Sequence, residues 1–318
     1  MVTTDRRILF TDTRYTFQAR QEVSGARVHV AKHGLLRAAA EAVSQVRRRG
    51  VLRLAYPPSQ MTVAQKRAMT GRLPGRIRWV PADNLVERLR AVKDAEELSR
   101  MRDSARLISG VFEQSLKFIR PGVLETDIAA EVEYRMRKAG AAGPSFETIV
   151  ASGPRSAWAH ARPSSKPLTK NELVVLDQGA ILRAYCSDMT RTVYLGRCPK
   201  KISRMYAAVL EALEAAKSVV RPGVKASAVD AAARGVLARR GLARYFTHST
   251  GHGLGLEVHE MPRVGRGDST RLEAGMVVTI EPGVYIEGLG GIRIEDDVVV
   301  TPQGGQDLTT ASRELFEL

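Results

Sequence analysis

Apolar and polar positions follow two different periods along the first ninety residues. Three short runs rich in β-branched and aromatic residues predict strands: RILFTD, VLRLAY and RIRWV. Between them, apolar residues recur at helical spacing in residues 34–50, a predicted helix that ends at Gly50, and in residues 62–73. Alternating strands and helices favour a small α/β domain over residues 1–90.

The pattern changes near residue 90, where a long amphipathic helix is predicted from about residue 93 to residue 119. Residues 119–140 and 220–241 then align without a gap at an offset of 101 residues and share an RPGV turn and a closing glycine. Each segment predicts a turn and a helix capped by glycine, followed by strand-like sequence. We therefore expect residues 91–318 to form an α+β domain of two duplicated halves with pseudo-twofold symmetry.

Acidic residues stand at matching points in the strand-like sequence of each half. VVLDQG in the first half matches VTIEPG in the second, which sets Asp177 opposite Glu281; Asp188 and Glu295 follow shortly after. The runs ELVVLDQGA and AYCSDMTRTVYLG predict a hairpin with a glycine-containing turn. A buried carboxylate without a partner is costly, so four of them need hydrogen bonds, arginines or cations. Two divalent cations would balance the four negative charges.

The alternative is that these acids lie at strand ends, where they are solvated or paired with arginines. The arginines available for such pairs are Arg183, Arg191 and Arg293.

The stretch HSTGHGLGLEVHE, residues 248–260, holds three of the six histidines of the chain. Its glycines allow the backbone to come close to a metal centre, with His252 as a ligand and His248 and His259 serving the chemistry. A loop that is merely rich in histidine is the alternative. Four carboxylates and one imidazole form a hard, oxygen-rich ligand set, which suits Mn²⁺, with Co²⁺ or Zn²⁺ as alternatives.

The net charge of +15 is concentrated in the first part of the chain. Residues 1–92 carry 18 Lys and Arg against 6 Asp and Glu, including the runs RRR and GRLPGRIR, whereas residues 93–318 carry 31 against 28. A nucleic-acid site would use such a patch. Because no aromatic residues are interleaved with it and no known binding motif is present, we favour a solvated basic surface and do not expect nucleic acid as a partner.

The remaining composition predicts a cytoplasmic globular protein. Apolar residues make up 44% of the chain and charged residues 26%, a balance that allows a buried core. No run reaches the roughly 18 consecutive apolar residues of a membrane span, and the start, MVTTDRRILF, lacks the apolar core of a signal peptide. Cys186 and Cys198 are too few for a disulfide framework and lack zinc-site spacing, so we expect reduced thiols.

Together these motifs resemble the pita-bread metallopeptidases, specifically the Xaa-Pro group that includes prolidase and aminopeptidase P. The strings SDMTRTV, THSTGHGLGLEVHE, TIEPGVY and GGIRIEDDV occur in the order found in that family. The resemblance covers residues 93–318 and, more weakly, the sequence before them. It implies a pita-bread catalytic domain over residues 91–318, preceded by a creatinase N-terminal-like domain over residues 1–90.

The resemblance also implies a metal site. The family's five ligands occur in the order Asp, Asp, His, Glu, Glu and match Asp177, Asp188, His252, Glu281 and Glu295. By this resemblance Asp188 and Glu295 bridge two divalent metal ions. Asp177 completes one metal site, and His252 and Glu281 complete the other.

Further positions match the active site of the family. The residues expected to take part in catalysis are His160, His248, His259 and Glu281. Those expected to line the substrate pocket or to orient the bridging glutamate are Tyr285 and Arg293. His29 and His33 match no family position and are expected to be ordinary surface residues.

The implied activity is hydrolysis of the peptide bond between an N-terminal residue and proline, as in an Xaa-Pro aminopeptidase or Xaa-Pro dipeptidase. Two metals lower the pKa of a water between them, and the metal-bridged hydroxide is the nucleophile. Glu281 would carry the proton towards the proline nitrogen, while His259 and His160 would stabilise the oxyanion. Because the Xaa-Pro bond is a tertiary amide without an N–H, a dedicated pocket is expected.

Three alternatives stay open. A methionine aminopeptidase uses the same five ligands but usually lacks an N-terminal α/β domain. A creatine-cleaving relative keeps the fold without the metals, and the intact ligand set argues against it. A pita-bread module that only binds nucleic acid or protein would be expected to have lost metal ligands.

The N-terminal domain is expected to be truncated. RILFTDTRYTFQARQEV resembles a segment well inside the family's N-terminal domain, yet it begins here at residue 7. Either the start codon is misplaced or the chain is natively short. Because this domain helps to form the family's homodimer and limits substrate length, we expect a weak homodimer or an open pocket.

Overall fold

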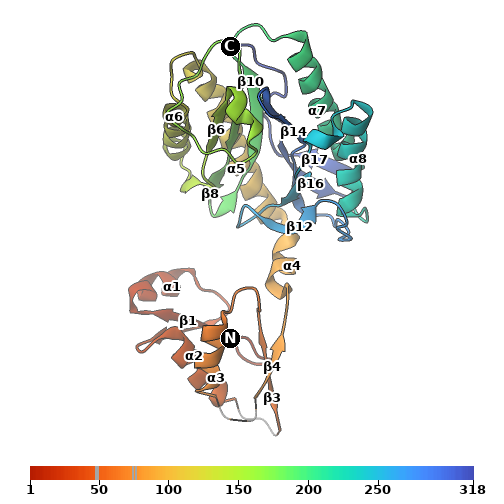
Figure 1. Ribbon diagram of the computed structural model, residues 1–318. Helices are drawn as coiled ribbons and strands as arrows, with labels where there is room; N and C mark the ends of the chain where they lie inside the picture. Colours follow the sequence, from red (N-terminus) through yellow and green to blue (C-terminus); the bar gives the residue numbers. More distant parts are fainter. Residues whose placement is uncertain (47–49, 74, 76) are drawn as a thin grey trace. The chain divides into compact units, whose positions relative to one another are not determined.

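The computed structural model describes residues 1–46, 50–73, 75 and 77–318. Within it the chain divides into two compact units, Met1–Leu85 and Val86–Leu318 (Figure 1). The boundary predicted between residues 90 and 91 falls within helix α4 (Leu85–Ala91).

The N-terminal unit alternates strands and helices, as its hydrophobic pattern predicts. Its elements follow in the order β1 (Ile8–Asp12), α1 (Thr16–Glu22), β2 (Arg27–Ala31), α2 (Leu35–Ser44), β3 (Leu52–Tyr56), α3 (Val63–Thr70) and β4 (Ile77–Pro81). Strand β1 pairs with β2 and β3 pairs with β4, both in parallel. Ala40 and Val43 of α2 and Met69 of α3 form the buried core of this unit.

Helix α2 is shorter than its sequence pattern predicts. It ends at Ser44, whereas the predicted helix ran to Gly50. The RRR run at residues 47–49 and residues 74 and 76 of GRLPGRIR lie outside the described residues.

Four helices of the second unit lie outside its sheets (Figure 1). They are α5 (Ala95–Ser115), α6 (Glu125–Lys138), α7 (Lys200–Val219) and α8 (Ala226–Arg239). The long helix predicted from about residue 93 to residue 119 corresponds to α5, which ends at Ser115 and is followed by a 3-10 turn, Leu116–Phe118. Asp94 caps α5 by accepting from the Glu97 N–H, while the Glu97 side chain accepts from the Asp94 N–H. This reciprocal capping box fixes a new helix start.

The two predicted repeats adopt the same structure. Helices α6 and α8 begin and end at positions exactly one repeat offset apart, and each follows a turn with a glycine at positive φ, Gly122 and Gly223. The Gly122 N–H donates to Leu168 O and the Gly223 N–H donates to Leu272 O, both at 2.8 Å. The duplicated α+β organisation predicted for this region is thus confirmed.

The sheets of this unit bring together strands from the segments that follow each repeat. The strands are β5 (Gly143–Pro144), β6 (Ile149–Ser152), β7 (Leu173–Gln178), β8 (Ala180–Leu182), β9 (Tyr185–Cys186), β10 (Met189–Tyr194), β11 (Gly251–Gly253), β12 (Glu260–Val264), β13 (Val277–Ile280), β14 (Gly283–Ile286), β15 (Gly290–Arg293), β16 (Asp296–Thr301) and β17 (Gly304–Asp307). Their sheet orders are β10-β7-β6, β12-β11-β13-β16-β17, β14-β15 and β5-β8-β9. One apolar core packs under the helices of each half.

The hairpin predicted around the first two acids is present, but its turn differs from the prediction. Strands β7 and β10 pair antiparallel, with Asp177 opposite Thr190. The chain reverses between β8 and β9 at Arg183 and Ala184, which have φ of 49° and 72°. Two consecutive residues at positive φ match the twist of a tight hairpin, a conformation that usually selects glycine or asparagine. The turn therefore could not be located from its residue types.

Candidate metal centre

Three side chains that lie in or next to three different strands converge in the second unit. Asp188 immediately precedes β10, His252 is the central residue of β11, and Glu295 lies between β15 and β16. One ligand atom from each of these residues lies within 4.8 Å of the others, and both carboxylates are buried. Two carboxylate oxygens and an imidazole nitrogen at this separation can bind a single divalent cation.

Close packing of backbone around His252 requires the glycines on either side of it. A Cβ on Gly251 would lie 1.8 Å from the carbonyl oxygen of Thr279, and one on Gly253 would lie 2.1 Å from that of Met261. Both distances are far below van der Waals contact, so β11 fits between its neighbours only without side chains at these positions. The glycine-rich motif therefore fixes the strand that carries His252.

We expect Gly251→Ala to destabilise the protein by about 3 kcal/mol or more, since neighbouring backbone must move to admit the methyl group. Thermal unfolding and metal content measure the effect. Gly110→Ala is the matched control, because Gly110 lies inside α5 with no atom within 4 Å of the added Cβ. That change should stabilise by about 0.5–1 kcal/mol through helix propensity. Equal behaviour of the two variants would contradict the close-approach argument.

Glu281 and Asp177 adjoin the three converging residues. Glu281 Oε1 and Asp188 Oδ2 each lie 3.7 Å from His252 Nε2. Asp177 Oδ2 accepts a hydrogen bond from Arg293 Nη2 at 2.6 Å. All five predicted ligands thus line one cavity. One of them, Asp177, is also paired with Arg293.

The hydrogen bond made by His252 leaves Nε2 free to bind a cation. His252 Nδ1 lies 3.0 Å from the carbonyl oxygen of Gly253. A carbonyl only accepts hydrogen bonds, so Nδ1 carries the proton and Nε2 presents its lone pair towards Asp188 and Glu281. Burial lowers the pKa of His252 to about 4, which keeps the ring neutral. A lone pair facing two carboxylates is repulsive without a cation between them.

The carboxylates themselves also fit a cation. Asp177 Oδ1 and Asp188 Oδ1 are buried without a hydrogen-bond partner among the described residues. Burial, followed by the charges of Glu295 and Asp177, raises the pKa of Asp188 well above its ordinary value. Burial likewise raises the pKa of Glu295, with further contributions from Glu281 and Asp177, and burial is the main cause that raises the pKa of Glu281 to about 8. Divalent cations would relieve this unfavourable charge density.

Metal removal should therefore make stability strongly dependent on pH. Carboxyls with raised pKa values bind more protons in the folded than in the unfolded state, so the free energy of unfolding falls as pH rises. For Glu281 this window runs from its ordinary pKa of 4.5 to about 8. We expect chelated protein to lose on the order of a few kcal/mol between those limits, and metal-loaded protein to lose far less. Equal melting-temperature profiles with and without chelator would favour the arginine-paired alternative.

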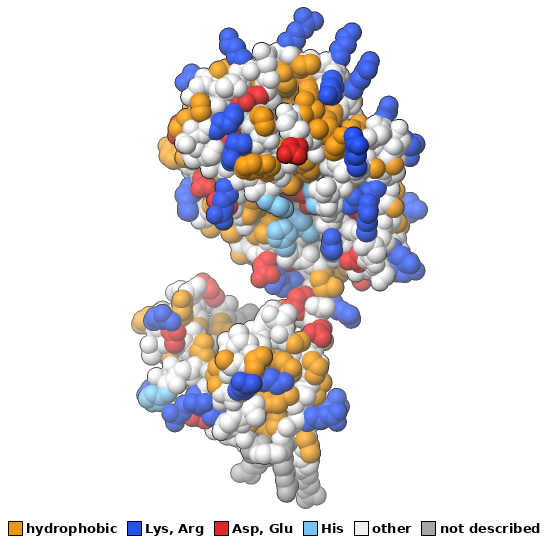
Figure 2. Space-filling view, in the orientation of Figure 1, with side chains coloured by type: hydrophobic (Ala, Val, Ile, Leu, Met, Phe, Trp, Pro, Cys, Tyr) orange, Lys and Arg blue, Asp and Glu red, His pale blue; other side chains and the backbone are white. Residues whose placement is uncertain are grey.

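A cavity beside these residues collects the predicted histidines. Two adjoining hollows, each of about 350 Å³, share His160, His252, His259, Glu281 and Arg293 in their linings. Figure 2 shows histidine side chains gathered in one place on the surface of the catalytic unit. The rings of His252 and His259 meet edge to face, with centroids 4.3 Å apart. A substrate in this cavity would contact imidazoles next to the ligand cluster.

His248, Tyr285 and Arg293 form a chain of hydrogen bonds that leads to Asp177. His248 Nδ1 donates to Ser249 O at 2.7 Å, so its Nε2 accepts from the Tyr285 hydroxyl at 2.9 Å. The same hydroxyl accepts from Arg293 Nη1 at 2.6 Å. Burial, then the charge of Arg293, lowers the pKa of His248 to about 4. The His248 ring is therefore neutral, and both of its nitrogens form hydrogen bonds within the protein.

Two supporting residues were not assigned a role from the sequence. The Thr190 hydroxyl donates to Glu295 Oε2 at 2.6 Å, and Asp297 Oδ2 accepts from the backbone N–H of Asp188 at 3.0 Å. Side chains alternate along a strand, so Asp297 lies on the same face as Glu295. The spacing of two residues from Glu295 is the sequence signal that could have indicated a role for Asp297.

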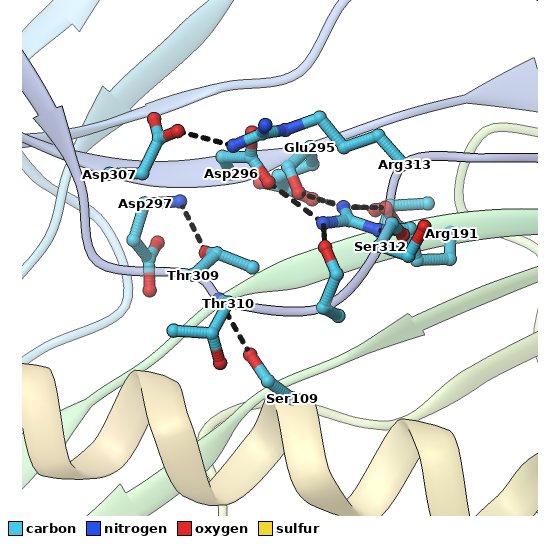
Figure 3. A network of polar contacts seen from close by, with 12 residues as sticks. Ser109, Arg191, Glu295, Asp296, Asp297, Asp307, Thr309, Thr310, Ser312 and Arg313 are labelled. Carbon is cyan, nitrogen blue, oxygen red and sulfur yellow. Dashed lines mark hydrogen bonds and ion pairs between the residues drawn. The ribbon is translucent and has the colours of Figure 1, made fainter.

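The other two arginines of the paired alternative form no ion pair with the carboxylates of the converging acids among the described residues. Arg191 is fully buried and donates to Asp296 Oδ1 at 2.9 Å and to the carbonyl oxygen of Glu295 at 2.6 Å (Figure 3). Arg183 pairs with Asp103 at 3.0 Å. Asp296 points away from the ligand cluster, as its strand position predicts. Arginine pairing therefore serves Asp177 alone among the five predicted ligands in the described structure.

Other predictions outside the centre have simple outcomes. His29 and His33 are exposed, as expected. Cys186 and Cys198 are free thiols. Among the residues that the structure describes, no helix combines the length and apolar character needed to cross a bilayer.

The fold and this site define a metallopeptidase with a further domain before its catalytic unit. Residues 99–302 match metallopeptidase family M24, and residues 1–92 match the Creatinase/Prolidase N-terminal domain. The chain belongs to metallopeptidase family M24. Family membership implies divalent metal ions as cofactors and peptides as substrates.

Relatives and solved structures agree with this assignment. An Xaa-Pro dipeptidase from Pyrococcus horikoshii is 42% identical over 234 residues, which cover 74% of this chain and 67% of the relative. The structure of an Xaa-Pro dipeptidase from Bacillus anthracis matches with a TM-score of 0.95 and 37% identity over 100% of this chain and 88% of that one. An X-Pro aminopeptidase from Thermotoga maritima gives 0.91 and 36% over 100% and 89%. The predicted pita-bread fold with a creatinase-like N-terminal domain is confirmed.

Proposed function

We propose that this protein hydrolyses the bond between an N-terminal residue and proline. The observation that carries the proposal is the convergence of Asp188, His252 and Glu295 beside a histidine-lined cavity. The similarity to Xaa-Pro dipeptidases and to an X-Pro aminopeptidase supports the choice of substrate class. We further propose that the enzyme works in the cytoplasm, since both of its cysteines are free thiols.

Two divalent ions, with Mn²⁺ as the first choice, are proposed to bind at this centre. The residues that would hold them are Asp177, Asp188, His252, Glu281 and Glu295. Bound there, such ions make a nucleophile available from water at neutral pH. The hard oxygen donors favour Mn²⁺ over thiolate-seeking ions.

The protein's own groups would supply proton transfer and charge stabilisation. Glu281 lines the cavity next to His252, where a carboxylate could take a proton from water and pass it to the leaving proline nitrogen. His160 and His259 are exposed in the same cavity and can donate to the oxyanion as it develops. Arg293, held by Tyr285 and Asp177, would orient the substrate.

The direct test is hydrolysis of Xaa-Pro dipeptides and of longer Xaa-Pro peptides in parallel, with and without Mn²⁺, Co²⁺ or Zn²⁺. We expect metal-dependent release of the N-terminal residue from at least one substrate class, and none from matched peptides with alanine in place of proline. Preferential cleavage of Met-Ala peptides would support the methionine aminopeptidase alternative. A protein that binds no divalent metal and stays inactive would support the binding module.

A further inference from the structure

A buried carboxylate contacts both ends of the loop that carries His160. Glu125, the first residue of α6, is fully buried. Its Oε1 accepts the N–H and the hydroxyl of Ser152, both at 2.8 Å. Its Oε2 accepts the N–H and the hydroxyl of Ser164, at 3.1 and 2.7 Å. Since Ser152 and Ser164 flank the loop on either side of His160, the Glu125 side chain joins its two ends. Lys166 Nζ also donates to Ser152 Oγ at 2.8 Å, and Arg293 Nη1 donates to Ala159 O at 3.1 Å.

An arginine extends this clamp into the loop. Arg155 Nε donates to Glu125 Oε2 at 3.1 Å, and its Nη2 donates to the carbonyl oxygen of Arg162 at 2.6 Å. Burial alone would raise the pKa of Glu125, but the hydrogen bonds from Ser164 and Ser152 and the charge of Arg155 hold that pKa below its ordinary value. The carboxylate is therefore ionised and accepts all of these hydrogen bonds at neutral pH.

The second half builds the same kind of clamp around His248. Asp230, buried in α8, accepts the N–H and the hydroxyl of Thr250 on Oδ1, at 3.2 and 2.8 Å. Arg234 Nε donates to Asp230 Oδ2 at 2.7 Å, and its Nη atoms donate to Phe246 O at 3.0 Å and to His248 O. In both halves a helix acid and one arginine thus fix the backbone next to a histidine of the cavity.

The acids of the two clamps do not align at the repeat offset of 101 residues. Glu125 aligns with Ala226, whereas Asp230 lies four residues further along α8. The two acids are therefore not equivalent positions inherited from the repeat. What they have in common is that each fixes a backbone segment next to a histidine of the cavity. An exposed loop held only by its own backbone is mobile, and a displacement of about 1 Å at a reacting group costs up to ~100-fold in rate.

We propose that Glu125 is a positioning residue for His160. By joining Ser152 to Ser164, it holds the imidazole in the position required for contact with the substrate. The role of His160 rests on the proposed function. Glu125 itself contacts no substrate, and it acts only through the loop. Its effect on catalysis should therefore disappear when His160 is absent.

The test is a double-mutant cycle between Glu125→Gln and His160→Ala. Glutamine puts a donor amide where the carboxylate accepts from a serine or from Arg155. We expect Glu125→Gln to lower kcat/KM on an Xaa-Pro substrate about 10- to 100-fold with unchanged metal content. In the His160→Ala background it should cause no further loss. Multiplicative losses would overturn the proposal, since they would mean that Glu125 acts on the enzyme generally.

Two further variants control for folding. Glu131→Gln, on the same helix, removes an acid that pairs with Arg135 and should leave kcat/KM at the wild-type value. If Glu125→Gln does not fold, Ser164→Ala removes one hydrogen bond to Glu125 and should give a smaller loss, a few-fold, with the same dependence on His160. A loss in Ser164→Ala that persists without His160 would also overturn the proposal.

Amide hydrogen exchange separates this proposal from the proposed function. Glu125→Gln should speed exchange in residues 153–163 and leave residues 246–250, held by Asp230, unchanged. If wild-type protein hydrolyses no Xaa-Pro substrate, the proposed function fails, and exchange still decides whether Glu125 orders the His160 loop. Unchanged exchange in residues 153–163 would overturn the positioning role.

Discussion

Replacing Glu295 with glutamine is expected to remove tight metal binding and to lower kcat/KM by at least about a thousandfold, which corresponds to several kcal/mol of lost transition-state stabilisation. Glu295 is one of the three residues whose ligand atoms converge. Glutamine has the same shape and can still accept from Thr190, so the change removes charge rather than packing. Elemental analysis after dialysis against limiting Mn²⁺, together with peptidase kinetics, measures both effects.

The same variant should be more stable than wild type when both are free of metal. The raised pKa of Glu295 reflects burial of its charge and repulsion from Glu281 and Asp177. Glutamine carries no charge, so both unfavourable contributions to folding are removed. Asp296→Asn next to it is the contrasting control. Asp296 pairs with Arg191, Lys217 and Arg313, so its neutralisation should destabilise by about 3–5 kcal/mol. Wild-type metal affinity in Glu295→Gln would exclude Glu295 as a ligand.

Glu281→Gln is expected to abolish turnover while part of the metal stays bound. The cluster of Asp188, His252 and Glu295 remains complete in this variant, whereas the proton carrier proposed for the reaction is lost. Because Glu281 is also one of the proposed metal ligands, we expect kcat to fall by about a thousandfold or more. Single-turnover kinetics and metal stoichiometry on the same sample separate the two effects.

Glu287→Gln makes the same chemical change six residues further along the chain, at an exposed position in the turn between β14 and β15. It should retain wild-type kinetics. Substantial turnover by Glu281→Gln at full metal occupancy would remove Glu281 from the mechanism.

The parts of the fold that the sequence predicts well are those with a strong local signal. The RPGV turns and glycine caps set the ends of α6 and α8, because glycine at positive φ ends a helix wherever it occurs. The carboxylates in apolar strands signal a cation because burial penalises charge regardless of the surrounding fold.

The parts that the sequence does not predict depend on contacts between distant segments. The turn at Arg183 and Ala184 adopts a conformation that its residues disfavour, and only the pairing of β8 with β9 imposes it. Glu125 looks like an ordinary acid in the first turn of a helix until Ser152 and Ser164 are brought to it.

The proposed metal ligands are divided between the two halves of the second unit. Asp177 and Asp188 come from the first half, whereas His252, Glu281 and Glu295 come from the second. Neither half alone carries all five of the proposed ligands. Ions bound at the proposed site would therefore connect the two halves, and we expect their removal to weaken the contact between the halves.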